Sequence, residues 1–185
     1  MSPGPKSKYV ALLRGINVGG NNIIKMSALR EAFEALGFTD VATYIQSGNV
    51  VFGATTSDQQ KLTKKIEAAL SKTFSYDAKL VVLSGRDLEL AVAEAPPKFG
   101  KEPAKYRYDV LFVKAPMTTK EALAQVTLKD GVDDAHAGQH ALYFRRLIAK
   151  ATSSHLQKIT QKPVYKSLTI RNWNTTMKLL EMASG

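Results

Sequence analysis

The chain has 185 residues, of which 44% are hydrophobic, so it can bury the core of one sizeable domain or two small ones. Its 26 Lys and Arg residues against 16 Asp and Glu residues give a net charge of +10, which favours anionic partners. It contains no cysteine, which excludes disulfides, thiolate metal sites and thiol nucleophiles and fits a reducing compartment.

The chain opens with a turn-rich, basic segment that we interpret as a loose tail over residues 1–8. The apolar run that follows, residues 9–13, ends at Arg14 and is too short for a signal sequence or a membrane span. We therefore expect a cytoplasmic protein that does not bind membranes. A short continuous apolar run is typical of a central strand that is covered on both faces.

The first half of the chain alternates strand and helix patterns. Gly37 stands where a helix would end, and Ser57 opens what reads as a capping box for a second helix. The patterns predict strands at 9–13, 40–46, 50–52 and 79–83, and helices at 26–36 and 57–74. The order β-α-β-β-α-β predicts a ferredoxin-like sandwich of the α+β class, with four antiparallel strands and two helices on one face.

The second half predicts a shorter α/β arrangement of similar order. Residues 96–105 hold three prolines without periodicity and are interpreted as a linker between a domain at 9–95, with its connector helix, and a subdomain at 106–185. The elements expected after the linker are a strand at 106–114, a helix capped at Thr118, a hairpin over 132–146, a helix at 153–160, a strand at 164–170 and a C-terminal helix at 172–182.

A polar loop after the first strand is the candidate site. Strands one and two of a right-handed β-α-β unit run parallel, so their ends and the turn after strand two meet at one edge of the sheet. The residues that this brings together are Arg14, Gly15, Asn17, Gly19, Gly20, Asn21, Ser47 and Asn49. A glycine-rich loop before a helix N-terminus, with an arginine beside it, is typical of an anion site.

Two known phosphate motifs do not fit this loop. Asn21 and Asn22 replace the lysine and hydroxyl residue of a P-loop, and Asn17 replaces the second glycine of a dinucleotide fingerprint. A structural interpretation stays open beside the functional one: the glycines adopt positive φ and the asparagines hydrogen-bond their own loop.

Other polar groups give weaker signals. His136 and His140 span a predicted hairpin turn and need not converge, so we predict neither a metal nor a cofactor. Lys61, Lys64 and Lys65 lie on the polar face of the second helix, which is the ordinary position of solvated lysines.

Three longer motifs carry a family resemblance. They are residues 12–20 (LLRGINVGG), 43–52 (TYIQSGNVVF) and 171–175 (RNWNT), and together they resemble the bacterial family known as domain of unknown function 1697. The resemblance implies an α/β fold and no established activity, substrate or cofactor. It marks Arg171, Asn172 and Asn174, which either complete the first site or cap the helix that Trp173 anchors.

These observations predict a module that binds a small anionic ligand, such as a phosphorylated one, at the loop after the first strand. Sequence-tolerant nucleic-acid binding is an alternative, because the net charge and the fold suit it, although residues 47–52 lack the aromatic pattern of an RNA-recognition module. A second alternative is that the motifs have a purely structural role. No residue pair is placed to name a general acid or base, so catalysis, ligand identity and oligomeric state stay open.

Overall fold

The computed structural model describes residues 7–185, so the predicted tail lies outside the described residues except for Ser7 and Lys8, which begin the first strand. The chain forms two compact units. The first unit extends to Leu88 and also includes Leu179–Gly185, and the second unit comprises Glu89–Lys178. The segment predicted as a linker, residues 96–105, therefore lies within the second unit. No helix in residues 7–185 is long and apolar enough to cross a membrane.

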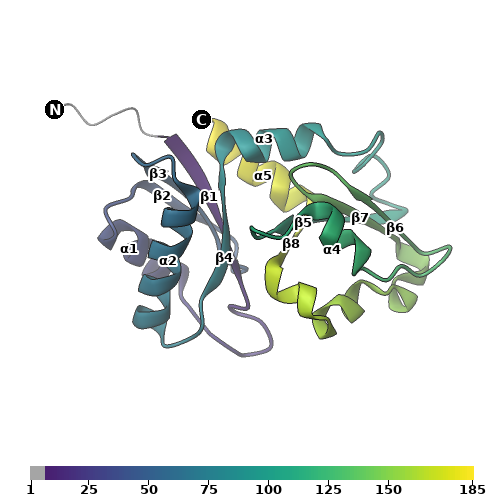
Figure 1. Cartoon of the computed structure of the whole chain (residues 1–185), viewed down its shortest axis with the longest axis horizontal. Coiled ribbons are helices and arrows are strands. Elements are labelled where there is room, and N and C mark those ends of the chain that lie inside the picture. The colour runs from purple at the N-terminus through teal and green to yellow at the C-terminus, as the bar shows by residue number, and fades with distance from the viewer. Residues whose placement is uncertain (1–6) are drawn as a thin grey trace. The chain divides into compact units, whose positions relative to one another are not determined.

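The first unit contains an antiparallel sheet in the order β2-β3-β1-β4. Its strands are β1 (Ser7–Arg14), β2 (Thr39–Tyr44), β3 (Asn49–Ala54) and β4 (Lys79–Ser84), and its helices are α1 (Met26–Ala35), α2 (Gln59–Phe74) and the first half of α3 (Gly85–Ala93). Helices α1 and α2 cover one face of the sheet (Figure 1). This is the ferredoxin-like arrangement that the element order predicted.

The core of this unit is built around β1. Tyr9, Ala11 and Leu13 pack in one cluster with Phe33 of α1 and Ile66 of α2. The alternate residues Val10 and Leu12 point to the other face of the sheet, and each has an exposed fraction of 0%. The continuous apolar run therefore reflects a strand covered on both faces, as predicted.

Two sequence predictions in this unit are corrected. Asp58 caps α2, accepting a hydrogen bond from Lys61 N at 3.0 Å, whereas the predicted box began at Ser57. A carboxylate interacts more favourably with the helix dipole than a hydroxyl does. The second strand was predicted at residues 40–46, but β2 ends at Tyr44. The alternation of its side chains between the two faces is interrupted by a bulge after Thr39, where Asp40 has φ 51°.

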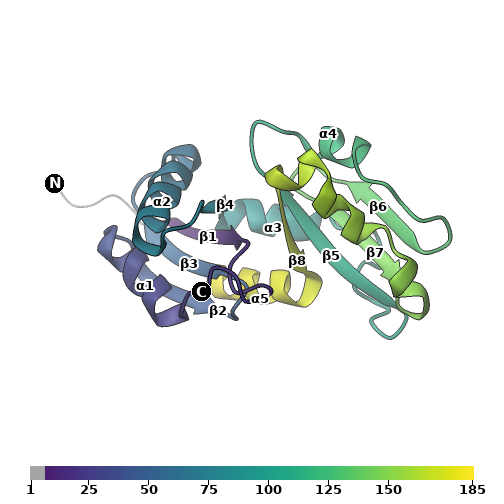
Figure 2. The same cartoon turned by 90° about the horizontal axis from the view of Figure 1, so that it is seen from below.

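The second unit contains an antiparallel sheet in the order β6-β7-β5-β8 (Figure 2). Its strands are β5 (Tyr106–Val113), β6 (Asp133–Ala137), β7 (Leu142–Leu147) and β8 (Leu168–Asn172), joined by α4 (Thr119–Ala124) and followed by α5 (Trp173–Ser184). The capping box at Thr118 is confirmed. Numbered from its own first strand, this sheet has the same order as the first.

The segment between β7 and β8 differs from the prediction. Instead of an α-helix at 153–160 it forms three 3₁₀ helices, Ile148–Ser153, Leu156–Gln161 and Pro163–Ser167, and β8 begins at Leu168. Pro163 has no backbone N–H and disfavours helix at the residue before it, so the turns stay short.

Helix α5 buries a different face from the one that the spacing of its apolar residues predicts. The spacing of Trp173, Met177 and Leu180 predicts that these three form the apolar face, yet Met177 is 41% exposed. The buried residues of the helix include Thr176, Leu179 and Ala183. Burial of Thr176 is tolerated because its hydroxyl donates to Asn172 O at 3.1 Å.

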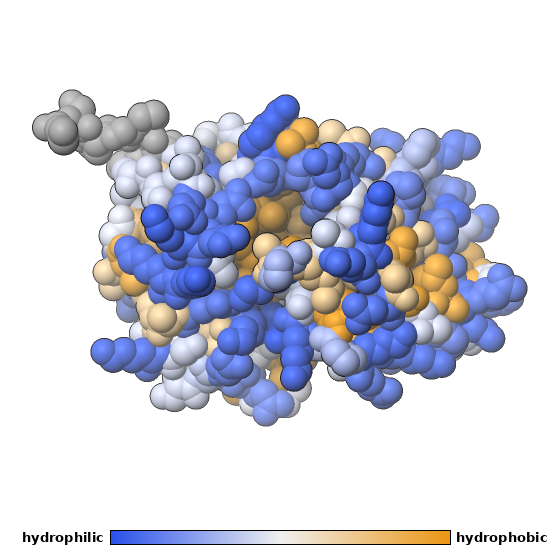
Figure 3. All heavy atoms as spheres, viewed as in Figure 1, coloured by the Kyte–Doolittle hydropathy of each residue, from blue (hydrophilic) through white to orange (hydrophobic). Residues whose placement is uncertain are grey.

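Hydrophilic side chains predominate on the face of the molecule in Figure 3, as expected for a chain with 23% charged residues.

The turn between β2 and β3 yields a stability prediction. Gly48 has φ +83°, and a Cβ there would lie 2.7 Å from Ile16 Cδ1 and 2.8 Å from Leu13 Cβ. Gly48→Ala combines a left-handed backbone with overpacking, so we expect the free energy of unfolding to fall by about 2–5 kcal/mol. Gly20→Ala, at φ +77° in open space, should lose only about 1–2 kcal/mol. Urea unfolding followed by circular dichroism measures both, and equal losses would contradict the close approach.

Candidate functional site

The loop after β1 lies against the turn between β2 and β3, at one edge of the first sheet. Leu13 N donates to Gly48 O at 2.8 Å, and Asn17 Nδ2 donates to Gln46 O at 2.9 Å. Strands β1 and β2 both run antiparallel to β3 and therefore parallel to each other. The structure thus brings the two segments together where the strand order placed them.

Asn17 organises this loop. Its Nδ2 donates to Ile24 O at 3.0 Å as well as to Gln46 O, and its Oδ1 accepts from Ile24 N at 2.8 Å. Asn22 closes the base of the loop by donating from Nδ2 to Gly15 O at 2.8 Å. Both amide hydrogens of Asn17 are engaged within the protein, so this side chain has a structural role.

The remaining predicted residues of the loop and turn fall into two groups. Asn49 is buried, and its Nδ2 donates to Tyr44 O at 2.8 Å and Ser47 Oγ at 3.0 Å, so this pair closes the hairpin. Gly15, Gly19, Gly20 and Asn21 are exposed, and the three glycines have positive φ. A ligand at this edge would meet the backbone of those glycines rather than the amides of Asn17 and Asn49.

Two cations lie at the same edge. Arg14 ends β1 and stands opposite Lys79 in the register with β4. A hydrogen bond to Asp77, at 2.8 Å, raises the pKa of Lys79, while the charge of Arg14 lowers it by a smaller amount. An anion at this edge would be attracted by both side chains.

The third motif lies in the second unit, where its contacts are those of capping and packing. Arg171 is 7% exposed, its Nη1 donates to Ile170 O at 2.8 Å, and burial lowers its pKa to about 10. Asn172 Oδ1 accepts from Asn174 N at 3.0 Å at the start of α5. Trp173 packs edge-on against Phe99, with ring centroids 5.1 Å apart. A ligand role for Arg171, Asn172 and Asn174 stays a prediction.

The two histidines of the β6–β7 hairpin have different surroundings. His136 faces the ring of Tyr143 at 6.5 Å, whereas His140 Nδ1 lies 2.6 Å from Glu94 Oε1. Across residues 7–185 there is no group of three or more His, Asp or Glu side chains that would hold a metal ion.

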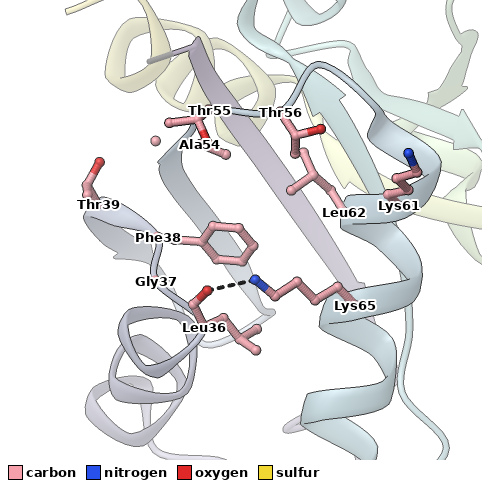
Figure 4. A pocket seen from close by; sticks show the side chains of 11 residues that line it. Leu36, Gly37, Phe38, Thr39, Ala54, Thr55, Thr56, Lys61, Leu62 and Lys65 are labelled. Carbon is pink, nitrogen blue, oxygen red and sulfur yellow. Dashed lines mark hydrogen bonds between the residues drawn. The ribbon is translucent and has the colours of Figure 1, made fainter. Parts of the chain in front are cut away.

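A cavity of about 280 Å³, which no sequence pattern indicated, lies at the opposite end of β3 (Figure 4). It lies between the end of α1, the start of β2 and the first turns of α2. The residues that matter for its chemistry are Phe38, Thr39, Ala54, Lys61, Leu62 and Lys65. Two of the three lysines interpreted as solvated, four positions apart on α2, therefore line a cavity, and Lys64 does not.

Lys65 is held on the wall of this cavity by two contacts. Its Nζ donates to Leu36 O at 2.8 Å and lies 5.2 Å from the centre of the Phe38 ring (Figure 4). Leu36 is the C-cap of α1, where the helix dipole attracts a cation. Phe38 is itself fixed against Phe52, with ring centroids 4.6 Å apart. The ammonium group is thereby placed beside an apolar surface.

A hydroxyl group on the same wall is unsatisfied. Thr39 Oγ1 is buried and has no hydrogen-bond partner in the described part of the chain. Gly53 leaves space for it, since a Cβ at that position would lie 2.7 Å from the oxygen. A buried hydroxyl without a partner destabilises the protein, and this oxygen packs over Gly53 rather than opening to the cavity.

Comparison with known proteins gives a family and a fold. The family model described as "Protein of unknown function (DUF1697)" matches residues 7–143. The solved structure of the conserved bacterial protein SP0830 from Streptococcus pneumoniae is 27% identical, with a TM-score of 0.84, and the match covers 97% of this chain and 99% of that chain. No curated protein matches the chain.

The network around Asn17 predicts a large effect of its removal. Asn17→Ala deletes three side-chain hydrogen bonds and leaves Ile24 N without its acceptor, so we expect a loss of about 2–4 kcal/mol in the free energy of unfolding. Asn21→Ala, at an exposed position of the same loop, should change it by less than about 0.5 kcal/mol. Urea unfolding of the two variants checks this, and a loss no greater than that of Asn21→Ala would show that the network is dispensable.

Proposed function

The chain belongs to the DUF1697 family of proteins of unknown function, and we propose that its first unit binds a small anionic ligand. One observation carries the proposal: the Lys65 ammonium is fixed at the wall of a cavity, over the ring of Phe38. Within residues 7–185 the ammonium group donates only to Leu36 O, so two of its three N–H groups can contact a ligand. The net charge of +10 supports an anionic partner.

The lining of the cavity indicates the kind of ligand. Lys65 and Lys61, which pairs with Asp58, supply positive charge, and Phe38 and Leu62 supply apolar surface. A volume of about 280 Å³ is large enough to hold a small molecule rather than only single water molecules. A compact molecule with one carboxylate or phosphate group and an apolar or aromatic body fits these features.

The loop after β1 is a second location for the same function. Arg14 opposite Lys79, beside the exposed backbone of Gly15, Gly19 and Gly20, supports anion binding at that edge. The two locations lie at opposite ends of β3 and share no residue, so variants distinguish them.

Sequence-tolerant nucleic-acid binding is the alternative function, supported by the net charge and by the ferredoxin-like order of the first unit. It requires many phosphate contacts, and affinity would then fall steeply with salt as counterions are released. The contacts of Asn17, Asn49 and Asn172 support the third possibility, in which the family motifs serve folding.

A titration with benzoate, phenyl phosphate and a short single-stranded RNA, followed by amide NMR shifts, tests the proposal. Lys65→Gln should weaken binding of the small anions at least tenfold, about 1.4 kcal/mol, because it removes the fixed charge. Lys64→Gln is the matched control, since Lys64 is an exposed neighbour on α2 that does not line the cavity.

The outcomes separate the alternatives. Weaker binding in Lys65→Gln but not in Lys64→Gln supports the cavity, and weaker binding only in Arg14→Ala assigns the function to the loop. Binding of RNA alone, lost as salt is raised, contradicts the proposal, as does the absence of any shift with benzoate and phenyl phosphate.

A further inference from the structure

The second unit contains a cavity of its own, of about 600 Å³, beside the turn between β6 and β7. Its lining includes Met117, Lys120, Gln139 and His140. It lies where β5 ends and α4 begins, which is the position in the second sheet that the loop after β1 occupies in the first. No family motif covers it.

Glu94 holds His140 in a defined orientation. Glu94 Oε1 lies 2.6 Å from His140 Nδ1, and Oε2 accepts from Gln139 N at 2.8 Å and His140 N at 3.1 Å. The absence of a side chain at Gly138 permits this approach, because a Cβ there would lie 2.8 Å from Glu94 Oε2. The carboxylate is therefore fixed by three contacts to a single turn.

This geometry determines which nitrogen of His140 carries the proton. Burial raises the pKa of Glu94, but the hydrogen bonds from His140 and Gln139 together outweigh it and lower the pKa below its ordinary value. Glu94 is then ionised at neutral pH and can only accept hydrogen bonds. Nδ1 must be the donor, which leaves Nε2 of the neutral ring with a free lone pair.

The environment of Nε2 indicates what it would contact. Within residues 7–185 this nitrogen has no hydrogen-bond partner, although His140 lines the cavity. Lys120 is the cation of the lining, and the nearby charge of Glu121 is engaged by Thr118 N at 2.8 Å in the capping box. The hydroxyl of Thr119 is engaged by Gly138 O. A ligand would meet a proton acceptor, Nε2, together with a cation.

We propose that this cavity binds phosphomonoesters, with His140 accepting the proton of the bound phosphate. The P–O–H group donates to Nε2 while an anionic oxygen pairs with Lys120. Transfer of that proton breaks the phosphate O–H bond, forms the Nε2–H bond and leaves a dianion beside an imidazolium that Glu94 neutralises. No other bond changes and no co-reactant is needed. The class follows from chemistry: a phosphomonoester, with a second pKa of about 6, keeps that proton in about half of the molecules at pH 6 and about a tenth at pH 7, whereas a carboxylic acid, with a pKa near 4, has lost it.

Histidine NMR of the whole chain tests this inference without a variant. A two-bond ¹H–¹⁵N correlation should show His140 protonated at Nδ1 in the free protein. Addition of phenyl phosphate should shift the His140 ring resonances and leave those of His136, on the same hairpin, unchanged. Methyl phenyl phosphate, a diester of similar size that is already fully ionised near neutral pH and has no proton to donate, should bind at least tenfold more weakly.

Two variants extend the test. Glu94→Gln should shift His140 toward the other tautomer and weaken phenyl phosphate binding about tenfold, and Lys120→Gln should weaken it with the Nδ1 tautomer retained. Lys129→Gln, outside the cavity, should do neither. An Nε2-protonated His140 in the free protein, equal affinity for monoester and diester, or equal shifts at His136 would overturn the proposal. The response of His140 should persist in Lys65→Gln, which separates this site from the one proposed in the first unit.

Discussion

The first unit depends on the burial of β1 between β3 and β4. Residues 9–13 are at most 2% exposed, and the strand pairs antiparallel with both neighbours. Burial on both faces leaves no freedom to shift the register, because a slip by one residue would exchange the side chains on the two faces. The C-terminal end of β1 is thereby fixed beside the β2–β3 turn, and the far end of β3 is fixed beside α2. Both candidate sites of this unit follow from that placement.

The polar residues of the family motifs and the polar residues that are chemically available are different sets. The amide groups of Asn17 and Asn49, in the loop and the turn, donate hydrogen bonds to backbone carbonyl groups. Such contacts define the backbone at the sheet edge but leave little for a ligand. The side chains with unused polar atoms, Lys65 and His140, lie on cavity walls outside the family motifs. Asparagine serves turns well because it tolerates positive φ and hydrogen-bonds locally, whereas fixed charges beside apolar surface serve binding.

The two units use one strand order with different chemistry at equivalent positions. At the edge after its first strand, the first unit has a loop filled by its own hydrogen bonds, and the second has an open cavity with His140 beside Glu94. In the second unit 3₁₀ turns replace the second long helix, yet Leu156, Ile159 and Val164 still cover the same face of the sheet. The sheet order thus sets where a site can form, and the loops determine what it contains.

The sequence alone determined the order of elements in the first half, the burial of β1 and the meeting of loop and turn, because periodicity, caps and the handedness of β-α-β units are local or topological rules. It did not determine the cap at Asp58, the 3₁₀ segments or the buried face of α5, where several local choices have similar free energies and packing selects one. Least accessible from sequence were the pairs that carry the proposed chemistry. Lys65 meets Phe38 and Glu94 meets His140 only in the folded chain, the latter pair across 46 positions, and no periodicity encodes contacts at such separations.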